Sequence, residues 1–277
     1  MKFSSPVISA LIIVLVCSNC SSQEFGTEQK LTASDAAAED YFGYDLAISG
    51  EILVVGSRFD DDAGPVSGSA YVYRYSGSSW IQEQKLTAND GAAGDQFGCA
   101  IAISGEILVV GARYDADAGS ESGAAYVYRY NGSTWIEEQK LTPSDAAQFD
   151  RFGFSVAISG DTIVVGALSG NGTVNNTGSA YVYRYIGSSW IEEQELLASD
   201  AAAHDQFGNS VTISGEIIAI GAQSSDDAGL GSGSAYVFRH NGSAWTEEQK
   251  LAASDAAAGD HFGCDLAIDG EIIVIGA

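Results

Sequence analysis

Residues 97–112 read FGCAIAISGEILVVGA, and close copies of this segment recur every 55 residues along a chain of 277 residues. A fixed period of this length indicates that one supersecondary unit is repeated and stacks on its neighbours, as in a solenoid, a propeller or an array. The copies begin at Phe42-Gly43, Phe97-Gly98, Phe152-Gly153, Phe207-Gly208 and Phe262-Gly263.

Each unit contains the pattern of four antiparallel β-strands. Large and small side chains alternate over residues 44–49, and after a turn at Gly50 residues 52–55 form an unbroken apolar run. Two further strands are predicted at 69–75 and 80–86, because β-branched and aromatic residues alternate there with polar ones. These four segments account for one complete sheet.

The turn between the last two strands is Asn-Gly in the second and fourth copies, which is a strong hairpin signal. If this turn has two residues, Tyr73 lies opposite Trp80, and Tyr128 lies opposite Trp135. Such aromatic pairs stabilise neighbouring strands by about 0.2–1 kcal/mol each.

The four strands of a unit become more polar in chain order, which favours a β-propeller. In that fold the inner strands of each blade are clamped between neighbouring blades, whereas the outermost strand meets water. We therefore predict an all-β propeller of four-stranded antiparallel blades. The innermost strands should bury one equivalent side chain per blade, namely Leu46, Ile101, Val156, Val211 and Leu266.

The predicted boundaries follow from the period. The propeller is expected over 23–277, with a lone outer strand at 28–33. Its blade units are expected at about 42–87, 97–142, 152–197 and 207–252, with a partial unit at 262–277.

The paired landmarks of each unit resemble FG-GAP repeats. The resemblance is carried by Phe42-Gly43 with Gly56-Ser57, and by the same pairing in every later copy up to Phe262-Gly263 with Gly276-Ala277. The family forms the N-terminal propeller of integrin α chains and occurs in many secreted bacterial proteins, so the resemblance implies a propeller used for binding.

Two features depart from that family. The final Pro of its motif is missing from every copy, and the turn after the first strand is only Ser49-Gly50-Glu51 or its equivalent. Integrin-like members carry a longer Asp-rich calcium loop at this turn, so the family's calcium sites do not transfer to this chain.

Family propellers usually have seven blades, which implies a chain cut at its C-terminus. The alternative is a five-bladed ring in which the strand of Leu31 completes the last blade.

The first 22 residues have the pattern of a signal peptide. Lys2 precedes the apolar run 7–16, which is too short to span a bilayer, and small residues follow it. Secretion or display at the cell surface is therefore expected. A lipid anchor at Cys17 or Cys20 is less favoured, since Val16 and Asn19 precede these cysteines. No other segment could cross a membrane.

Charge excludes one class of partner. The chain has 37 Asp and Glu against 12 Lys and Arg, a formal net charge of −25. Nucleic-acid binding draws most of its free energy from clustered basic residues, so nucleic acid is not an expected partner.

The acidic residues concentrate in two classes of loop that topology places on one face of a propeller. We predict that this face binds the ligand, through residues that recur with the repeat. They are Asp35, Asp40, Asp90, Asp95, Asp145, Asp150, Asp200, Asp205, Asp255 and Asp260. The competing interpretation is that each of these residues forms a turn or caps a helical turn.

A calcium site is the chemistry that best fits the second loop class. Asp60 and Asp62, and likewise Asp115 and Asp117, are spaced at i and i+2. Carboxylates at this spacing are typical ligands of Ca²⁺. Calcium is therefore a candidate cofactor of the acidic face.

Most basic residues occupy two structural positions. Arg74, Arg129, Arg184 and Arg239 recur on the third strand, and Lys30, Lys85, Lys140 and Lys250 recur on the fourth. We expect them to pair with nearby Glu residues or to cover aromatic rings of the outer sheet.

These observations predict a secreted or cell-surface binding or adhesion module, with an extracellular protein or glycan as partner and calcium in support. His204, His240 and His261 occupy unrelated places, and no nucleophile elbow, zinc spacing or phosphate loop is present, so an enzyme is not expected. Two alternatives stay open: a propeller-scaffold hydrolase or lyase acting on extracellular polysaccharide, and a purely structural surface protein.

Overall fold

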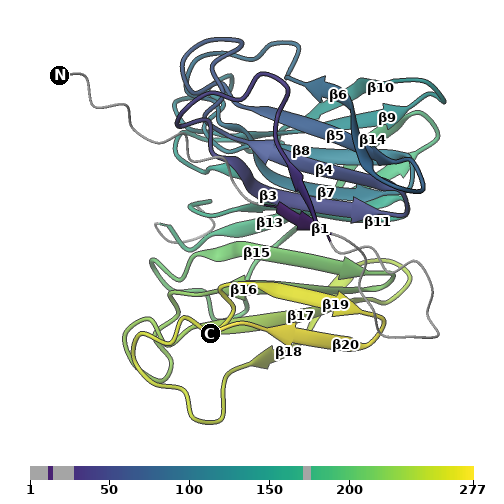
Figure 1. Cartoon of the computed structure of the whole chain (residues 1–277). Helices are drawn as coiled ribbons and strands as arrows, with labels where there is room; N and C mark the ends of the chain where they lie inside the picture. The colour runs from purple at the N-terminus through teal and green to yellow at the C-terminus, as the bar shows by residue number, and fades with distance from the viewer. Residues whose placement is uncertain (1–11, 15–27, 171–175) are drawn as a thin grey trace.

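The computed structural model describes residues 12–14, 28–170 and 176–277, and within these ranges every regular element is a β-strand (Figure 1). Four four-stranded antiparallel sheets are present, each in chain order from first to last strand. We call them blades 1 to 4. The all-β fold class is confirmed.

Each blade takes its strands from one copy of the repeat. Blade 1 holds β3 (Phe42–Ser49), β4 (Ile52–Ser57), β5 (Ser69–Tyr75) and β6 (Trp80–Leu86). Blade 2 holds β7 (Phe97–Ser104), β8 (Ile107–Ala112), β9 (Ala124–Tyr130) and β10 (Trp135–Leu141). Blade 3 holds β11 (Phe152–Ser159), β12 (Thr162–Ala167), β13 (Ser179–Ile186) and β14 (Ser189–Leu196). Blade 4 holds β15 (Phe207–Ser214), β16 (Ile217–Ala222), β17 (Ser234–His240) and β18 (Trp245–Leu251).

Two shorter sheets flank the blades. The hairpin of β19 (Leu266–Asp269) and β20 (Ile272–Ile275) follows blade 4. Strands β1 (Ile12–Val14) and β2 (Gln29–Leu31) pair antiparallel before blade 1. The rest of the predicted signal peptide lies outside the described residues. Within the described residues, the structure contains no helix that is long and apolar enough to cross a membrane.

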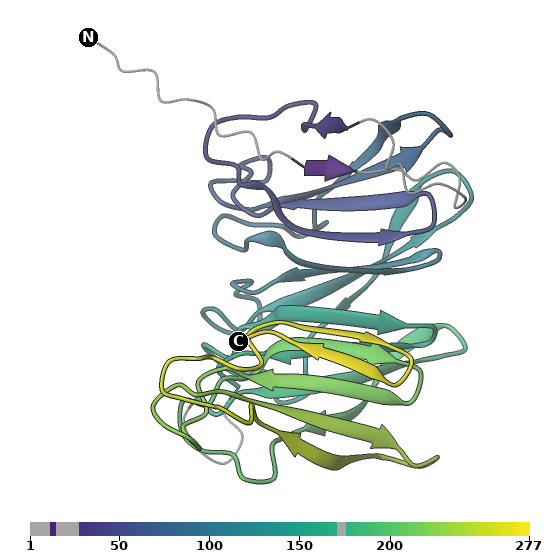
Figure 2. The ribbon, with the colours of Figure 1, turned by 60° about the horizontal axis from the view of Figure 1, so that its bottom comes forward.

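The blades stand side by side in a propeller-like arrangement, and neighbouring sheets bury the faces that they turn toward each other (Figure 2). Their first strands, β3, β7, β11, β15 and β19, contact one another in succession. The apolar cores lie between blades rather than within them: separate clusters join blades 1 and 2, blades 2 and 3, and blades 3 and 4. A fourth cluster packs Leu31 of β2 and the following Ala33 onto blade 1.

The Phe-Gly pair forms part of the joint between two blades. Phe97 is fully buried and meets the rings of Tyr126 and Tyr128 edge-on, at centroid distances of 5.5 and 6.0 Å. Gly98 has a φ of 86°, and a Cβ built on it would lie 2.3 Å from the carbonyl oxygen of Ser69 in the preceding blade. Glycine is required at this position because any side chain would separate the two sheets.

A pair of hydrogen bonds from one glutamine side chain to a Trp backbone joins the outer strands of neighbouring blades. We call this pair a Gln bracket. The side chain of Gln84 donates to the carbonyl oxygen of Trp135 at 2.9 Å and accepts from the Trp135 amide at 2.8 Å. The same pair of bonds joins Gln29 to Trp80, Gln139 to Trp190, and Gln194 to Trp245. Strand β2 thus holds the place of a fourth strand before blade 1.

The predicted register of the outer hairpin is wrong. Four residues, Ser76 to Ser79, connect β5 to β6, so Trp80 pairs with Tyr75 at a ring distance of 5.4 Å. Tyr73 faces Gln82 instead, beside a register shift in the ladder. The longer turn moves the cross-strand pairs between the turn and this register shift by two positions.

The equivalent apolar side chains of the first strands are not equally buried. Ile101 and Val211 are 6% and 8% exposed, as predicted, but Leu46 is 49% exposed. Val156 and Leu266 are partly buried. Leu46 lies on the face of β3 that turns away from blade 2, where Leu31 and Ala33 pack on the other strands of blade 1 and leave Leu46 half exposed.

Candidate functional site on the acidic rim

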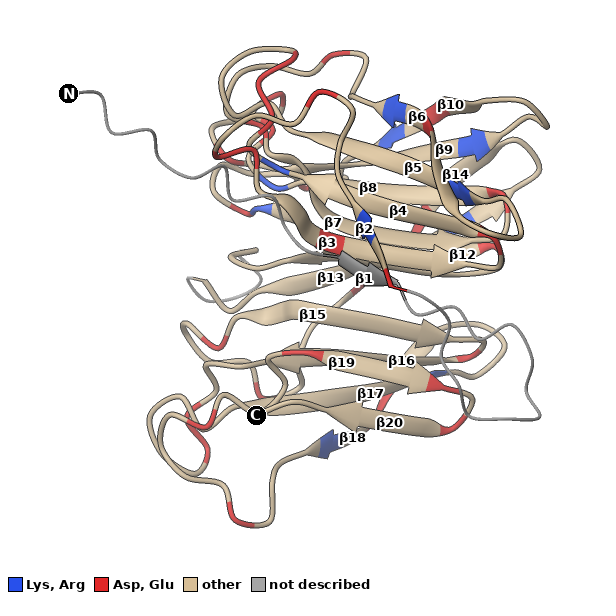
Figure 3. Ribbon diagram, viewed as in Figure 1, with Lys and Arg blue, Asp and Glu red and all other residues tan. Residues whose placement is uncertain are grey.

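The loops between blades and the loops between second and third strands share one end of the propeller, as predicted from topology. We call this end the rim. Red segments gather in these loops at the left of Figure 3, while others mark the hairpin turns on the right. In each blade the rim brings together residues that are far apart in sequence.

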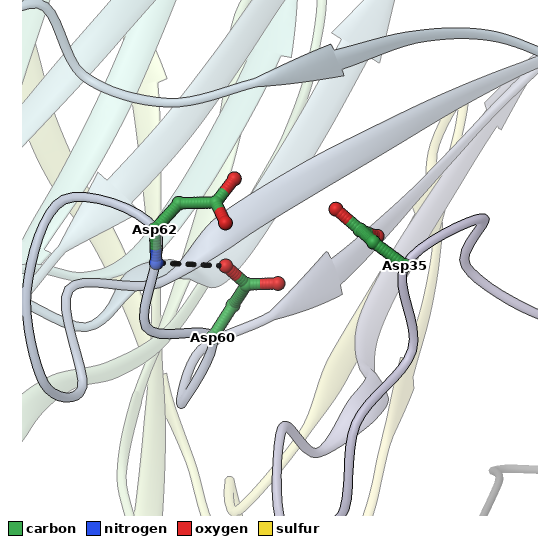
Figure 4. Close-up of side chains that lie close together, drawn as sticks. All are labelled: Asp35, Asp60 and Asp62. Carbon is green, nitrogen blue, oxygen red and sulfur yellow. Dashed lines mark hydrogen bonds between the residues drawn. The ribbon is translucent and has the colours of Figure 1, made fainter.

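In blade 1, three carboxylates converge from two loops (Figure 4). Asp35 lies in the β2–β3 loop, and Asp60 and Asp62 lie in the β4–β5 loop. One oxygen of each lies within 4.8 Å of the others, so the group could hold a metal ion. Asp60 is buried, whereas the side chains of Asp35 and Asp62 are 44% and 52% exposed.

Lys85, at the end of β6, supplies a cation to this group. Its Nζ lies 2.7 Å from Asp35, 3.0 Å from Asp60 and 2.5 Å from Asp62. It also lies 5.1 Å from the centre of the Tyr71 ring. The ammonium therefore contacts the same three carboxylates that a metal ion would use.

Two hydroxyl groups complete the cluster. The Tyr71 hydroxyl lies 2.8 Å from Asp35 Oδ1 and 2.7 Å from Asp60 Oδ2, and Ser69 donates to Asp60 Oδ1 at 3.0 Å. Buried Asp60 is thereby surrounded by donors, as a buried carboxylate requires.

Blade 2 repeats this arrangement with few changes. Lys140 Nζ lies 2.8 Å from Asp90, 2.8 Å from Asp115 and 2.7 Å from Asp117. The Tyr126 hydroxyl lies within 2.8 Å of both Asp90 and Asp115. The three carboxylates again form a group that could hold a metal ion.

Blade 4 keeps the lysine but has one carboxylate fewer. Lys250 pairs with Asp200 at 2.6 Å and with Asp227. Ser225 stands where blades 1 and 2 have their buried Asp, and it donates to Asp227 Oδ2 at 2.8 Å. Blade 3 departs further, since Gly170 and Glu195 occupy the positions of the buried Asp and of the lysine.

The ion pairs shift the pKa values of their members. Burial would lower the pKa of Lys85, but hydrogen bonds to Asp35, Asp62 and Asp60 outweigh it and raise that pKa. Burial would raise the pKa of Asp35, yet bonds from Lys85 and Tyr71 hold it below its ordinary value. Both groups are therefore charged at neutral pH.

The second acidic residue of each inter-blade loop serves its own loop. The carboxylate of Asp40 accepts from the Ala37 amide at 2.6 Å, and buried Asp95, Asp150 and Asp205 accept in the same way from the residue three positions earlier. Burial raises the pKa of Asp40. Asp260 makes the same bond to Ala257, while Asp255 lies exposed beside this loop.

The calcium loop of integrin-like propellers has no counterpart here. Ser49 pairs with Ile52, so the turn between β3 and β4 consists of Gly50 and Glu51 alone. The residues present at that turn do not fit a calcium ion.

The predicted contacts of the basic residues are right for arginine. For lysine, the predicted contact with aromatic rings is right and the predicted Glu partner is wrong. Arg74 pairs with Glu83 at 2.9 Å and lies 5.0 Å from the ring centre of Tyr130 in the next blade. The side chains of Lys85, Lys140 and Lys250 reach the Asp residues of the rim instead of outer-strand Glu residues. Their recurrence at the 55-residue step was visible in the sequence, but not the direction in which they point.

Comparison with known proteins places the repeats in one family. FG-GAP repeats match at 25–73, 80–128, 135–183, 190–238 and 245–277. No curated protein matches the chain. Because the matched repeats cover most of the sequence, the chain belongs to the FG-GAP repeat family.

Proposed function

We propose that this protein is a secreted or cell-surface binding module that presents its rim to a basic extracellular protein or to a glycan. The observation that carries the proposal is the repeated cluster of blades 1 and 2, in which three carboxylates face one lysine. Each cluster keeps a net negative charge after its lysine is counted.

The exposed members of the clusters are the proposed contact points. Asp62 and Asp117 pair with the lysines and are 52% and 69% exposed, whereas Asp60 and Asp115 are buried. Two equivalent clusters on neighbouring blades allow a partner with repeated basic groups to bind at both, which increases its affinity. The net charge of −25 would also speed its approach at low ionic strength.

A binding screen with matched variants tests this proposal. The chain is probed with arrays of glycans and basic extracellular proteins at low and physiological salt. A ligand of the rim should bind several-fold more weakly to the Asp62→Asn, Asp117→Asn double variant. The Asp161→Asn, Glu216→Gln double variant, an equal charge change at exposed turns on the opposite end, should leave binding unchanged. Equal binding by all three proteins, or turnover of a polysaccharide, would contradict the proposal.

Calcium and the lysine ammonium group would compete for the same carboxylates. A Ca²⁺ ion among Asp35, Asp60 and Asp62 must displace Lys85. The free energy needed to break the Lys85 ion pairs lowers the affinity of this cluster for Ca²⁺. Changing Asp60, Asp62, Asp115 and Asp117 together to Asn should remove any calcium-dependent rise in melting temperature that comes from these clusters. A rise that persists in this variant would place the ion elsewhere.

A further inference from the structure

Blade 3 reverses the charge at the centre of its rim cluster. Where blades 1, 2 and 4 place Lys85, Lys140 and Lys250, blade 3 places Glu195 on β14. In the described residues, no Lys or Arg forms an ion pair with Glu195 or with Asp145, the equivalent of Asp35. The cluster retains Asp145 but has Gly170 in place of the buried Asp, and a carboxylate stands where the other blades have a cation.

The two carboxylates of blade 3 converge on one phenol. The Tyr181 hydroxyl lies 3.1 Å from Asp145 Oδ1 and 3.4 Å from Glu195 Oε1. Burial and the charge of Asp145 raise the pKa of Glu195, because two nearby carboxylates in a partly buried place repel each other. The arrangement is electrostatically unfavourable as it stands.

A buried hydroxyl points into the same cluster. Ser179 is fully buried, and its Oγ makes no hydrogen bond of ordinary geometry. In blade 1 the equivalent Ser69 donates to Asp60, but blade 3 has Gly170 at that position. A Cβ built on Gly170 would lie 2.2 Å from Ser179 Oγ, so the hydroxyl projects into the space that an Asp side chain fills in blade 1.

Ser179 also lies next to the phenol. Burial raises the pKa of Tyr181, and the nearby Ser179 hydroxyl offsets part of this rise. Four oxygen-bearing side chains, two of them carboxylates, therefore surround the place where the other blades hold an ammonium group. The Ser179 hydroxyl interacts with the Tyr181 phenol but lies outside ordinary hydrogen-bond geometry, so a ligand at this place would complete its bonding.

We propose that blade 3 binds a calcium ion between Asp145 and Glu195, with the hydroxyl oxygens of Ser179 and Tyr181 as additional ligands. Ca²⁺ prefers such hard oxygen ligands, tolerates irregular geometry and completes its coordination with water. Two carboxylates match its double charge, and no lysine has to leave. The site lies on the rim, away from the short turn where integrin-like members bind calcium, and it does not depend on the identity of the partner.

Calorimetric titration of the full chain with CaCl₂ after chelation tests the proposal. Wild type should bind with a Kd on the order of 10⁻⁴–10⁻³ M, the range of extracellular calcium modules. Glu195→Lys, which supplies the cation of the other blades, should abolish this binding and stabilise the calcium-free protein. Ser179→Ala should weaken binding several-fold. Glu216→Lys makes the same charge change at an exposed hairpin turn and should leave binding intact.

Two results would overturn the site. One is the absence of any binding heat at concentrations tenfold above that range. The other is equal affinity in wild type and Glu195→Lys, which would place the ion elsewhere on the chain. The Asp62→Asn, Asp117→Asn double variant should still bind calcium, so failure of this site and failure of the proposed function are distinguishable.

Discussion

Lys85 shows how single residues connect distant parts of this chain. Its ammonium group joins Asp35, 50 residues earlier, to Asp60, 25 residues earlier. The aliphatic part of the side chain remains on the outer strand while the charge reaches the rim. A buried carboxylate such as Asp60 is stable only while this cation and the hydroxyl donors remain in place.

Replacing Lys85 by Met should therefore destabilise the protein by about 3 kcal/mol, because the buried charge of Asp60 loses its partner. Urea unfolding measures this change. Lys30→Met is the matched control: Lys30 holds the equivalent position on β2 and is exposed, so its replacement should cost less than about 0.5 kcal/mol. Equal losses in both variants would contradict the role assigned to Lys85.

The same ion pairs define a pH window. Asp35 has a lowered pKa, so its contribution to stability is present above its ordinary value of 3.8 and is lost as the pH falls through the folded value. Lys85 has a raised pKa, so its contribution is present below its ordinary value of 10.5 and is lost as the pH rises through the folded value. Between these limits the blade 1 cluster is intact.

Glu195 should give the opposite acid response in the absence of calcium. Its pKa is raised, so the stability it contributes is present below the ordinary value of 4.5 and is lost as the pH rises through the folded value. Glu195→Gln should therefore be more stable than wild type at pH 7 and similar to it at pH 4. Unfolding in a chelator at the two pH values measures this difference, and a wild type that is the more stable protein at pH 7 would contradict it.

At the scale of elements, neighbouring blades are joined through backbone groups as well as apolar cores. Each Gln bracket satisfies the amide and the carbonyl of a buried Trp on the next outer strand. The recurrence of Gln beside Lys on every fourth strand except β14, where Glu195 follows Gln194, was a visible signal. Its partner was not visible, since the bond spans 51 residues and two sheets.

Gln139→Ala should lower stability by about 2 kcal/mol, because two hydrogen bonds are lost and the Trp190 backbone is left without them. Thermal and urea unfolding measure the loss. Gln249→Ala tests the cause, since Gln249 has the same place on β18 but is exposed, and among the described residues no Trp pairs with it. Its replacement should be nearly neutral, and a loss as large as that of Gln139→Ala would show that the effect comes from strand propensity.

At the scale of the whole molecule, position in the row of blades decides the environment of equivalent residues. Leu46 and Ile101 occupy the same place in their repeats, yet only Ile101 has a neighbouring sheet against its side chain. Exposed Ile48, Ile272 and Val274 extend the apolar surface at the two ends of the row.

Leu46→Lys should change stability by less than about 0.5 kcal/mol, since the side chain is half exposed. Ile101→Lys should cost at least about 3 kcal/mol, because it buries a charge between blades 1 and 2. Melting temperatures of the two variants give the comparison. Comparable losses would mean that a sheet also covers the outer face of β3.

Period, alternation and turn residues are local properties, so the 55-residue unit, its four strands and the all-β propeller class could be predicted without coordinates. The sequence also placed the acids of the rim. The positions of three residues became clear only in the folded chain: Lys85 lies among these acids, Trp80 pairs with Tyr75, and Leu46 is exposed. These outcomes depend on turn length, on the direction of long side chains and on what packs against a face, and such distances exist only once segments 25 to 50 residues apart are brought together.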